Sequence, residues 1–210
     1  MAKKIVIDAG HGGSDNGASG NGIIEKDLTL DISKYMYDRL RELGIPVAIT
    51  RDSDVTLTPT ERVENILGKF GNSKDVIVVS NHINAGGGDG AEVIYALRNN
   101  SNLANLILDN LEEAGQNPRK AYQRRLPSDT SKDYYFIHRN TGVTEPVIVE
   151  YGFLDSTGDD VSQLKNNWQN LTEAVVKALA EYTNTPYDKG VSNTYTVKSG
   201  DTLFMGNNEY

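Results

Sequence analysis

The fold is decided by the stretch Val76-Ile77-Val78-Val79-Ser80-Asn81-His82. Its first four residues are all β-branched, which is typical of a strand that lies buried in a parallel sheet. The run then stops at a histidine, and open α/β sheets place their ligand sites at the carboxyl ends of such strands. The stretch therefore predicts a buried strand that delivers a functional side chain to the edge of a sheet.

Two other segments have the same design. One is Lys4-Ile5-Val6-Ile7-Asp8-Ala9-Gly10-His11, which ends at a histidine, and the other is Pro146-Val147-Ile148-Val149-Glu150, which ends at a carboxylate. Glu25 lies between them in the sequence. Because the carboxyl ends of parallel strands share one edge of a sheet, we expect these side chains to converge. The sequence therefore predicts a candidate metal site with one additional carboxylate.

Strand-like and helix-like segments alternate along most of the chain. The expected strands cover residues 4–9, 47–51, 75–80, 91–97 and 146–151, and the expected helices cover residues 25–43, 58–70, 103–113 and 161–182. Thr58-Pro59-Thr60-Glu61 predicts a capping box at the start of the second helix. Residues 10–24 indicate a loop, and residues 117–135 show no clear pattern. The alternation predicts an α/β fold with a twisted, mainly parallel sheet and helices on both faces.

The composition narrows the classes of protein. Of the 210 residues, 38% are hydrophobic and 24% are charged, as in globular proteins. The net charge of −8 argues against nucleic acid as a partner, because nucleic-acid binding needs a basic surface. The chain has no cysteine, which excludes disulfides and thiolate metal ligands. No run approaches the roughly 20 apolar residues of a membrane span, so we expect no membrane insertion.

The converging side chains match the requirements of a catalytic zinc site. His11, Glu25 and His82 form a set of two imidazoles and one carboxylate, which leaves a fourth position on the metal open. Glu150 remains as an acid or base group. Zinc activates water and polarises carbonyls, so the set predicts metal-assisted amide hydrolysis. Three polar residues are candidate hydrogen-bond partners of the histidines: Asp8, Ser80 and Asn84.

Each of these residues also has a purely structural interpretation. A histidine at a strand end is more often a hydrogen-bonded structural residue, and Glu25 at a helix start interacts favourably with the helix dipole without any ligand. Glu150 could instead pair with an arginine. Asp15 and Asn16 are expected to form a turn, and the context of His138 predicts no metal ligand. The Gly-rich loops lack the residue order of phosphate-binding loops.

Four ordered motifs resemble those of one family. They are Ile7-Asp8-Ala9-Gly10-His11-Gly12-Gly13, Gly22-Ile23-Ile24-Glu25-Lys26-Asp27-Leu28-Thr29-Leu30, Ser80-Asn81-His82-Ile83-Asn84-Ala85 and Val147-Ile148-Val149-Glu150-Tyr151-Gly152-Phe153-Leu154. Over residues 4–182 the chain resembles the zinc-dependent N-acetylmuramoyl-L-alanine amidases (cell-wall amidase type 3), which cut bacterial peptidoglycan. The resemblance implies a mixed, mainly parallel six-stranded sheet. It also implies Zn²⁺ held by His11, Glu25 and His82, with Glu150 as the catalytic residue.

Two residues depart from the family pattern. Asn81 stands where an apolar residue usually precedes the histidine, and we expect its side chain to point away from the ligand face. Tyr151 stands where a small or apolar residue usually follows the glutamate, and we expect it to alter the wall of the cleft.

The pattern changes after residue 183. Residues 184–193 have the composition of a linker. Tyr195-Thr196-Val197-Lys198-Ser199-Gly200-Asp201-Thr202-Leu203 resembles the opening of a LysM module, which binds glycans containing N-acetylglucosamine. We therefore predict a zinc amidase catalytic domain over residues 1–183, a linker over residues 184–193 and a truncated LysM-like segment over residues 194–210, with a disordered extension as the alternative.

The predicted function is hydrolysis, by a monomer, of the amide between N-acetylmuramic acid and L-alanine of peptidoglycan. The chain runs from Met1 into the first expected strand without a signal-peptide core, so we expect synthesis in the cytoplasm and action on the cell wall after release. This combination favours a phage or prophage endolysin. The alternatives are a mother-cell or other bacterial autolysin, a zinc peptidase that cuts within the stem peptide, and a catalytically inactive wall-binding protein.

Overall fold

A computed structural model describes residues 2–189 of the chain. Its centre is a six-stranded sheet in the order β4-β1-β5-β10-β6-β7. In that order, the strands are Val47–Ile49, Lys4–Ala9, Val76–Asn84, Glu145–Phe153, Ala91–Tyr95 and Pro118–Tyr122. Neighbouring strands are parallel except for β10 and β6, which are antiparallel. The predicted mixed, mainly parallel six-stranded sheet is confirmed.

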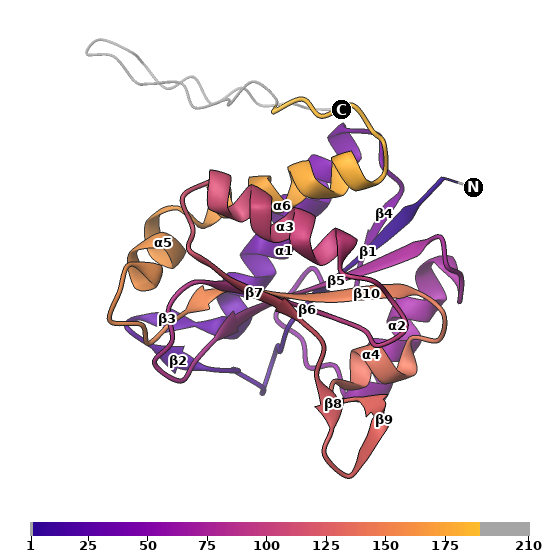
Figure 1. The fold of residues 1–210 in the computed structure, drawn as a ribbon, viewed down its shortest axis with the longest axis horizontal. Coiled ribbons are helices and arrows are strands. Elements are labelled where there is room, and N and C mark those ends of the chain that lie inside the picture. Colours follow the sequence, from indigo (N-terminus) through magenta and orange to yellow (C-terminus); the bar gives the residue numbers. More distant parts are fainter. Residues whose placement is uncertain (1, 190–210) are drawn as a thin grey trace, which may run out of the picture.

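Helices cover both faces of the sheet, as predicted (Figure 1). One face carries α1 (Glu25–Glu42), α3 (Asn102–Glu113) and α6 (Trp168–Tyr182), with α5 (Asp160–Asn166) just before α6; the other carries α2 (Pro59–Phe70) and α4 (Phe136–Asn140). The hydrophobic cluster beneath α1, α3 and α6 is large, whereas the cluster beneath α2 and α4 has only five buried residues. The thinner cover on the α2–α4 face leaves room for a cleft at the ends of the strands.

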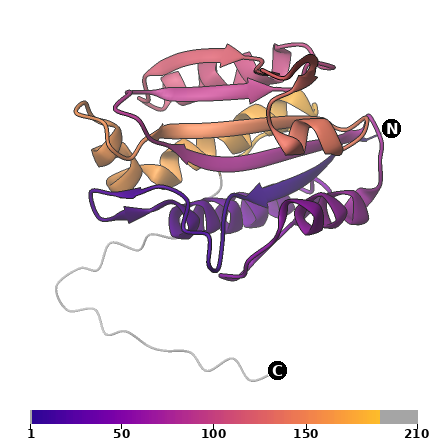
Figure 2. The ribbon, with the colours of Figure 1, turned by 90° about the horizontal axis from the view of Figure 1, so that it is seen from below.

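The strand β5 shows why the candidate residues lie on that thinner side. Successive side chains of a strand point to opposite faces, so Val79 joins the large cluster and Val78 joins the small one. His82 has the parity of Val78 and therefore projects on the α2–α4 face. Glu150 projects there too, because it is the register partner of His82 in β10, which runs beside β5 (Figure 2).

The helix α2 begins as the sequence predicts. The Thr58 hydroxyl accepts a hydrogen bond from the backbone N–H of Glu61 at 3.3 Å, and the Glu61 carboxylate accepts one from the Thr58 N–H at 2.8 Å. Pro59 follows as the first helical residue. This capping box satisfies backbone donors at the helix start, and it holds in place the end of α2 that borders the cleft.

Two segments for which the sequence predicts no strand, the expected loop over residues 10–24 and the unassigned residues 117–135, contain hairpins. Residues 10–24 contain β2 (Ser19–Gly20) paired with β3 (Ile23–Ile24), and residues 117–135 contain β7 followed by the pair β8 (Arg125–Leu126) and β9 (Asp129–Asp133). These strands are short and mostly polar, so they lack the apolar periodicity by which a strand is recognised in a sequence. The β8–β9 hairpin projects from the body of the molecule (Figure 1).

The prediction of a single helix over residues 161–182 is wrong. The chain leaves helical geometry at Asn167, where φ is −131°, and this residue separates α5 from α6. Leu164 of α5 and Leu171 of α6 both pack in the large cluster. The apolar spacing therefore continues through the break, and the sequence pattern does not reveal it.

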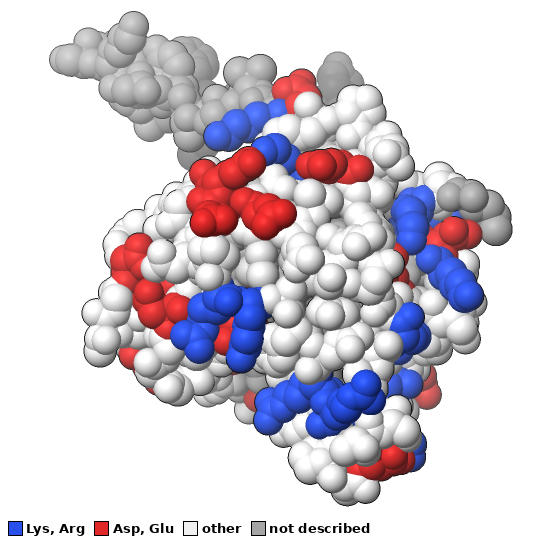
Figure 3. Space-filling view, in the orientation of Figure 1, with Lys and Arg blue, Asp and Glu red and all other residues white. Residues whose placement is uncertain are grey.

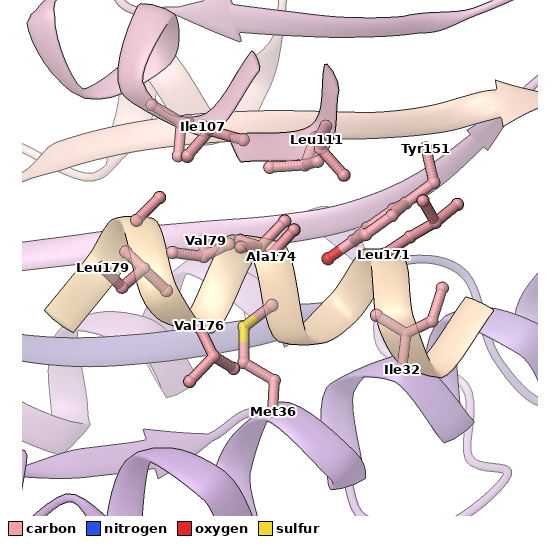
Figure 4. Packing of buried hydrophobic residues seen from close by; sticks show 14 of the residues in the cluster. Ile32, Met36, Val79, Ile107, Leu111, Tyr151, Leu171, Ala174, Val176 and Leu179 are labelled. Carbon is pink, nitrogen blue, oxygen red and sulfur yellow. The ribbon is translucent and has the colours of Figure 1, made fainter. Parts of the chain in front are cut away.

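The two departures from the family pattern contact each other in the core. Tyr151 is fully buried beside Leu171 (Figure 4) and does not form the cleft wall, so that expectation is wrong. Strand alternation explains the difference, because Tyr151 follows Glu150 and must point to the opposite face. The Tyr151 hydroxyl donates to Asn81 Oδ1 at 3.1 Å, and Asn81 Nδ2 donates to Ser33 Oγ at 2.9 Å. The expected orientation of Asn81, away from the ligand face, is confirmed.

We expect Tyr151→Phe to lower the free energy of unfolding by about 1–3 kcal/mol, because it leaves the buried Asn81 Oδ1 without its donor. The double variant Asn81→Val/Tyr151→Phe should lose less than the sum of the two single variants, since both partners are then removed together. Urea unfolding of the four proteins measures this coupling. Strictly additive losses would show that the hydrogen bond does not contribute.

After α6 the chain has no helix or strand as far as residue 189. The Tyr187 hydroxyl donates to Glu173 Oε1 at 2.8 Å, which ties the beginning of the expected linker to α6. The rest of that linker and the LysM-like segment over residues 194–210 lie outside the described residues. Among residues 2–189, no helix has both the length and the hydropathy needed to cross a membrane.

Candidate metal centre

Three side chains from distant parts of the sequence meet at the carboxyl edge of the sheet. His11 follows β1, Glu25 begins α1 and His82 lies near the end of β5. One donor atom from each lies within 4.8 Å of the other two. Glu25 Oε1 is 3.2 Å from His11 Nε2 and 3.0 Å from His82 Nδ1. The structure thus brings together the three residues that the sequence singles out as metal ligands.

The backbone around His11 is shaped to bring the two imidazoles together. His11 itself has a φ of 58°, a left-handed conformation that is uncommon for a residue other than glycine. At the preceding residue, Gly10, a Cβ atom would lie 2.5 Å from His82 Cε1. Only glycine allows the backbone to pass so close to the second imidazole, so the Gly-His pair is a packing requirement of the cluster.

Backbone donors hold the Glu25 carboxylate from both sides. Oε1 accepts a hydrogen bond from the N–H of Ile83 at 3.0 Å, and Oε2 accepts one from the N–H of Ala18 at 2.8 Å. Burial alone would raise the pKa of Glu25, but its contacts with His11 and His82 outweigh burial and hold the pKa well below its ordinary value. Glu25 is therefore an anchored, ionised carboxylate between two imidazoles.

Asp15 has a role that the sequence reasoning missed. Its Oδ2 lies 2.9 Å from His11 Nδ1, while its Oδ1 accepts the N–H of Gly17 at 3.1 Å. The second contact is the expected turn, and the first is the carboxylate–histidine contact that orients metal-binding imidazoles. An acceptor at Nδ1 favours the tautomer that keeps its proton on Nδ1, so Nε2 is the nitrogen of His11 that would bind a metal in the cluster. The sequence shows only a carboxylate four residues after the histidine in a Gly-rich turn, and this pattern does not distinguish a turn former from a partner of the ring.

The cluster fits a zinc ion by its donors and its electrostatics. Two imidazole nitrogens and one carboxylate oxygen are a common catalytic zinc set. Burial lowers the pKa of His11, but Glu25 and Asp15 outweigh burial and raise it to about 9. The carboxylates thus draw protons onto the imidazoles, and a divalent cation at this point would supply the same positive charge.

Glu150 lies beside the cluster with one oxygen unused. It lines the same cavity as His11 and His82, with a volume of about 170 Å³. Its Oε2 is buried and has no hydrogen-bond partner among residues 2–189. Burial raises the pKa of Glu150 to about 7, which is the range suited to a group that takes up and returns a proton near neutrality.

The rest of the cavity wall is largely apolar. Apart from Asp15 and Arg62, it is formed by the starts of α2 and α4 and by one residue of β10: Leu57, Pro59, Tyr135, Phe136, Ile137 and Ile148. Such a wall reduces the hydration of Glu150 and accounts for its raised pKa. The cleft therefore combines charged groups on one side with an apolar surface that can contact a substrate on the other.

The buried ion pair between Arg62 and Asp8 holds the backbone at His11 in place. Arg62 of α2 donates to Asp8 Oδ1 at 2.7 Å and to the carbonyl oxygen of His11 at 2.8 Å. Ser80 donates to Asp8 Oδ2 at 2.7 Å. The expectation that Asp8, Ser80 and Asn84 bond the histidines is wrong, because Asp8 and Ser80 bond each other and the Asn84 amide accepts the N–H of Ala85.

His138 lies outside the cluster, as the sequence predicts. It is fully buried, and neither ring nitrogen has a hydrogen-bond partner among the described residues. Burial, with the nearby charge of Arg98, lowers the pKa of His138 to about 3. His138 is therefore a neutral core residue in α4.

Comparison with known proteins identifies the family. The sequence model of the N-acetylmuramoyl-L-alanine amidases matches residues 5–181, a range that contains all four site residues. The chain belongs to the N-acetylmuramoyl-L-alanine amidase family. The family predicted from the four motifs is thus confirmed.

Relatives in this amidase family come from both bacteria and phages. The endolysin of Bacillus phage SPP1 is 32% identical over 91% of this chain and 70% of its own length. The germination-specific N-acetylmuramoyl-L-alanine amidase of Bacillus subtilis is 28% identical over 86% of this chain and 79% of its own length. Among solved structures, the N-acetylmuramoyl-L-alanine amidase AmiC2 of Nostoc punctiforme is 26% identical, with a TM-score of 0.72 over 87% of this chain and 97% of that chain.

Proposed function

We propose that this amidase-family chain uses zinc to hydrolyse the amide between the lactyl carbonyl of N-acetylmuramic acid and L-alanine in peptidoglycan. The observation that most directly supports this proposal is the His11–Glu25–His82 cluster. Glu150 lines the same cavity, and its Oε2 has no hydrogen-bond partner in the described part of the chain. Zinc, when bound, supplies Lewis-acid polarisation of the carbonyl and activation of water. All four side chains belong to one chain, so the site needs no residue from a second subunit, and we propose that the enzyme acts as a monomer.

The residues of the chain have distinct proposed roles. His11, Glu25 and His82 hold the metal, and Asp15 orients His11. Glu150 accepts a proton at Oε2 from the attacking water and then returns it to the leaving nitrogen of L-alanine. Its pKa near 7 allows both transfers at neutral pH. The apolar starts of α2 and α4 exclude bulk water from this exchange.

Mass spectrometry of digested cell walls tests the proposed reaction. Intact stem peptides that begin with L-alanine, together with unmodified glycan strands, are the expected products. Fragments cut within the stem peptide would instead establish the alternative zinc peptidase. Absence of any product from zinc-loaded protein would support the inactive wall-binding alternative.

Metal removal gives a second expected result. Dialysis against a chelator should abolish hydrolysis, and one equivalent of zinc should restore it. His82→Ala should lose both zinc and activity, because it removes one of three protein donors. Asn84→Ala is the matched control at the end of the same strand and should keep one zinc per chain by elemental analysis. Zinc binding that survives His82→Ala would rule out the proposed ligand set.

We also propose that the enzyme acts on the wall as a phage or prophage endolysin, with residues 1–183 as its catalytic domain. The 32% identity to a phage endolysin supports this role. The bacterial relative supports the autolysin alternative. In both roles the enzyme would hydrolyse the same amide bond with the same four side chains.

A further inference from the structure

The site continues across the sheet as a row of polar side chains. Glu150 is the register partner of His82 on one side and of Glu92 in β6 on the other, and Glu92 is the register partner of Lys120 in the edge strand β7. Side chains of such partners project on the same face of a sheet. Neighbouring strands lie about 4.8 Å apart, so Lys120 is two strands, or roughly 10 Å, from Glu150.

The outer end of this row carries two cations on a single buried carboxylate. Glu92 is only 4% exposed, and two cations share it: Arg119 Nε lies 2.8 Å and Lys120 Nζ lies 3.6 Å from its Oε1. Tyr122 donates to the other oxygen at 3.2 Å. The side chains of Arg119 and Lys120 remain 40% and 51% exposed. One buried carboxylate therefore holds two cations at the surface. Arg119 also donates to the backbone carbonyl of Asp89 at 3.3 Å and interacts with the nearby Asp89 carboxylate, so Lys120 has the less compensated charge of the two.

The positive charge extends beyond this pair. Residues 118–139 contain six Lys or Arg and two Asp, although the whole chain has a net charge of −8. Lys and Arg side chains gather over β7 and the base of the β8–β9 hairpin (Figure 3). Tyr135, which follows this hairpin, lines the cavity of Glu150. A basic surface that adjoins the site of an acidic protein indicates an anionic partner.

Resting on the proposed function, we propose that Lys120 and Arg119 bind a stem-peptide carboxylate in the second or third residue beyond the amide that is cut. Muramic acid uses its own carboxyl group in that amide, so nearby anions belong to the peptide side of the bond. Three extended residues span about 10 Å, which matches the separation of Glu150 and Lys120. The row would thus direct the leaving peptide across β6 toward β7.

Two synthetic substrates test this inference. Both are N-acetylmuramoyl tripeptides, and they differ only in whether the carboxyl groups of the second and third residues are free or amidated. The parent enzyme should favour the free carboxylates by about two- to fivefold in kcat/KM, mostly through KM, as expected for exposed ion pairs. Lys120→Glu should remove or invert this preference, and Lys120→Arg should retain it.

Lys34→Glu is the matched control for net charge. Lys34 is exposed on α1, which packs against β1 and β4 at the opposite edge of the sheet from β7. This variant should keep the parent's preference. If Lys34→Glu and Lys120→Glu lose the preference equally, or if the parent does not discriminate, the inference is overturned.

Calorimetry with the free and the amidated tripeptides separates this inference from the proposed reaction, because it requires no hydrolysis. The inference is supported if the tripeptide with free carboxyl groups binds more tightly than the amidated one and this difference depends on Lys120. If neither compound is hydrolysed in that case, only the proposed function fails. Equal binding of both peptides overturns the inference. Binding of poly(glycerol phosphate) that depends on Lys120, without discrimination between the peptides, would overturn it in favour of a wall phosphate polymer.

Discussion

Glu150→Gln is expected to lower kcat on peptidoglycan by about 10²- to 10⁴-fold, the usual contribution of a positioned acid or base. Glutamine keeps the size and position of the side chain but cannot take up the proton of the attacking water. Zinc content should remain at one per chain, because Glu150 is not among the three donors of the cluster. Release of stem peptides and elemental analysis of the same sample measure both quantities.

Glu145→Gln is the matched control for this substitution. Glu145 begins the same strand and bonds Lys3 and Tyr182, far from the cleft. We expect it to keep near-parental turnover. Parental turnover in Glu150→Gln, or a loss of its zinc, would show that Glu150 does not have the proposed role.

Glu150→Gln should also stabilise the metal-free protein at alkaline pH. Burial raises the pKa of Glu150 from 4.5 to about 7, so the folded state binds this proton more tightly than the unfolded chain does. Stability is therefore lost as the pH rises between these values, and above pH 7 the loss reaches up to about 3 kcal/mol. Glu150→Gln should melt higher than the parent at pH 8 and at the same temperature as the parent at pH 4. A difference independent of pH would contradict this account.

Arg62→Met should lower the free energy of unfolding by about 3–5 kcal/mol, because it leaves the charge of Asp8 buried without its partner. Arg62 is 5% exposed and Asp8 is fully buried. The substitution also removes the donor to the His11 carbonyl, so zinc affinity should fall together with stability. Urea unfolding and zinc titration measure the two effects.

Lys177→Met is the matched control for the loss of an ion pair. Lys177 and Glu113 form a surface pair whose side chains are 41% and 67% exposed. Removal of this surface ion pair should lower the free energy of unfolding by less than about 1 kcal/mol. Asp8→Asn/Arg62→Met should lose less than the two single variants combined, since neither charge is then left alone. If Arg62→Met costs no more than Lys177→Met, the buried pair does not support the site.

Much of the site was predictable because its local signals are strong. His11, His82 and Glu150 follow apolar β-branched runs, and such runs almost define buried strands. Parallel strands then place their carboxyl ends at one edge of the sheet. Asp15 was not predictable as a partner of His11, because an aspartate in a Gly-rich turn has the same sequence signature whether or not it contacts a ring.

Other features depend on which residues meet in space. The sequence suggested Asp8 as a partner of a histidine, but in the structure Asp8 forms an ion pair with Arg62, 54 residues later in the chain. Tyr151 looked like a residue of the cleft, but its strand turns it toward Asn81 in the core. The row from Glu150 to Lys120 depends on the register of three strands, which no local pattern encodes.

The amino-acid sequence by itself determined the α/β class, the family and the three ligand candidates with their neighbouring glutamate. These follow from short-range patterns: apolar periodicity, helix caps and ordered motifs. Only the tertiary structure decided the partners of each polar side chain, the unpaired oxygen of Glu150 and the basic edge beside it. Hydrogen bonds and ion pairs act over a few ångströms between residues that are far apart in the chain, so packing alone selects which of them form.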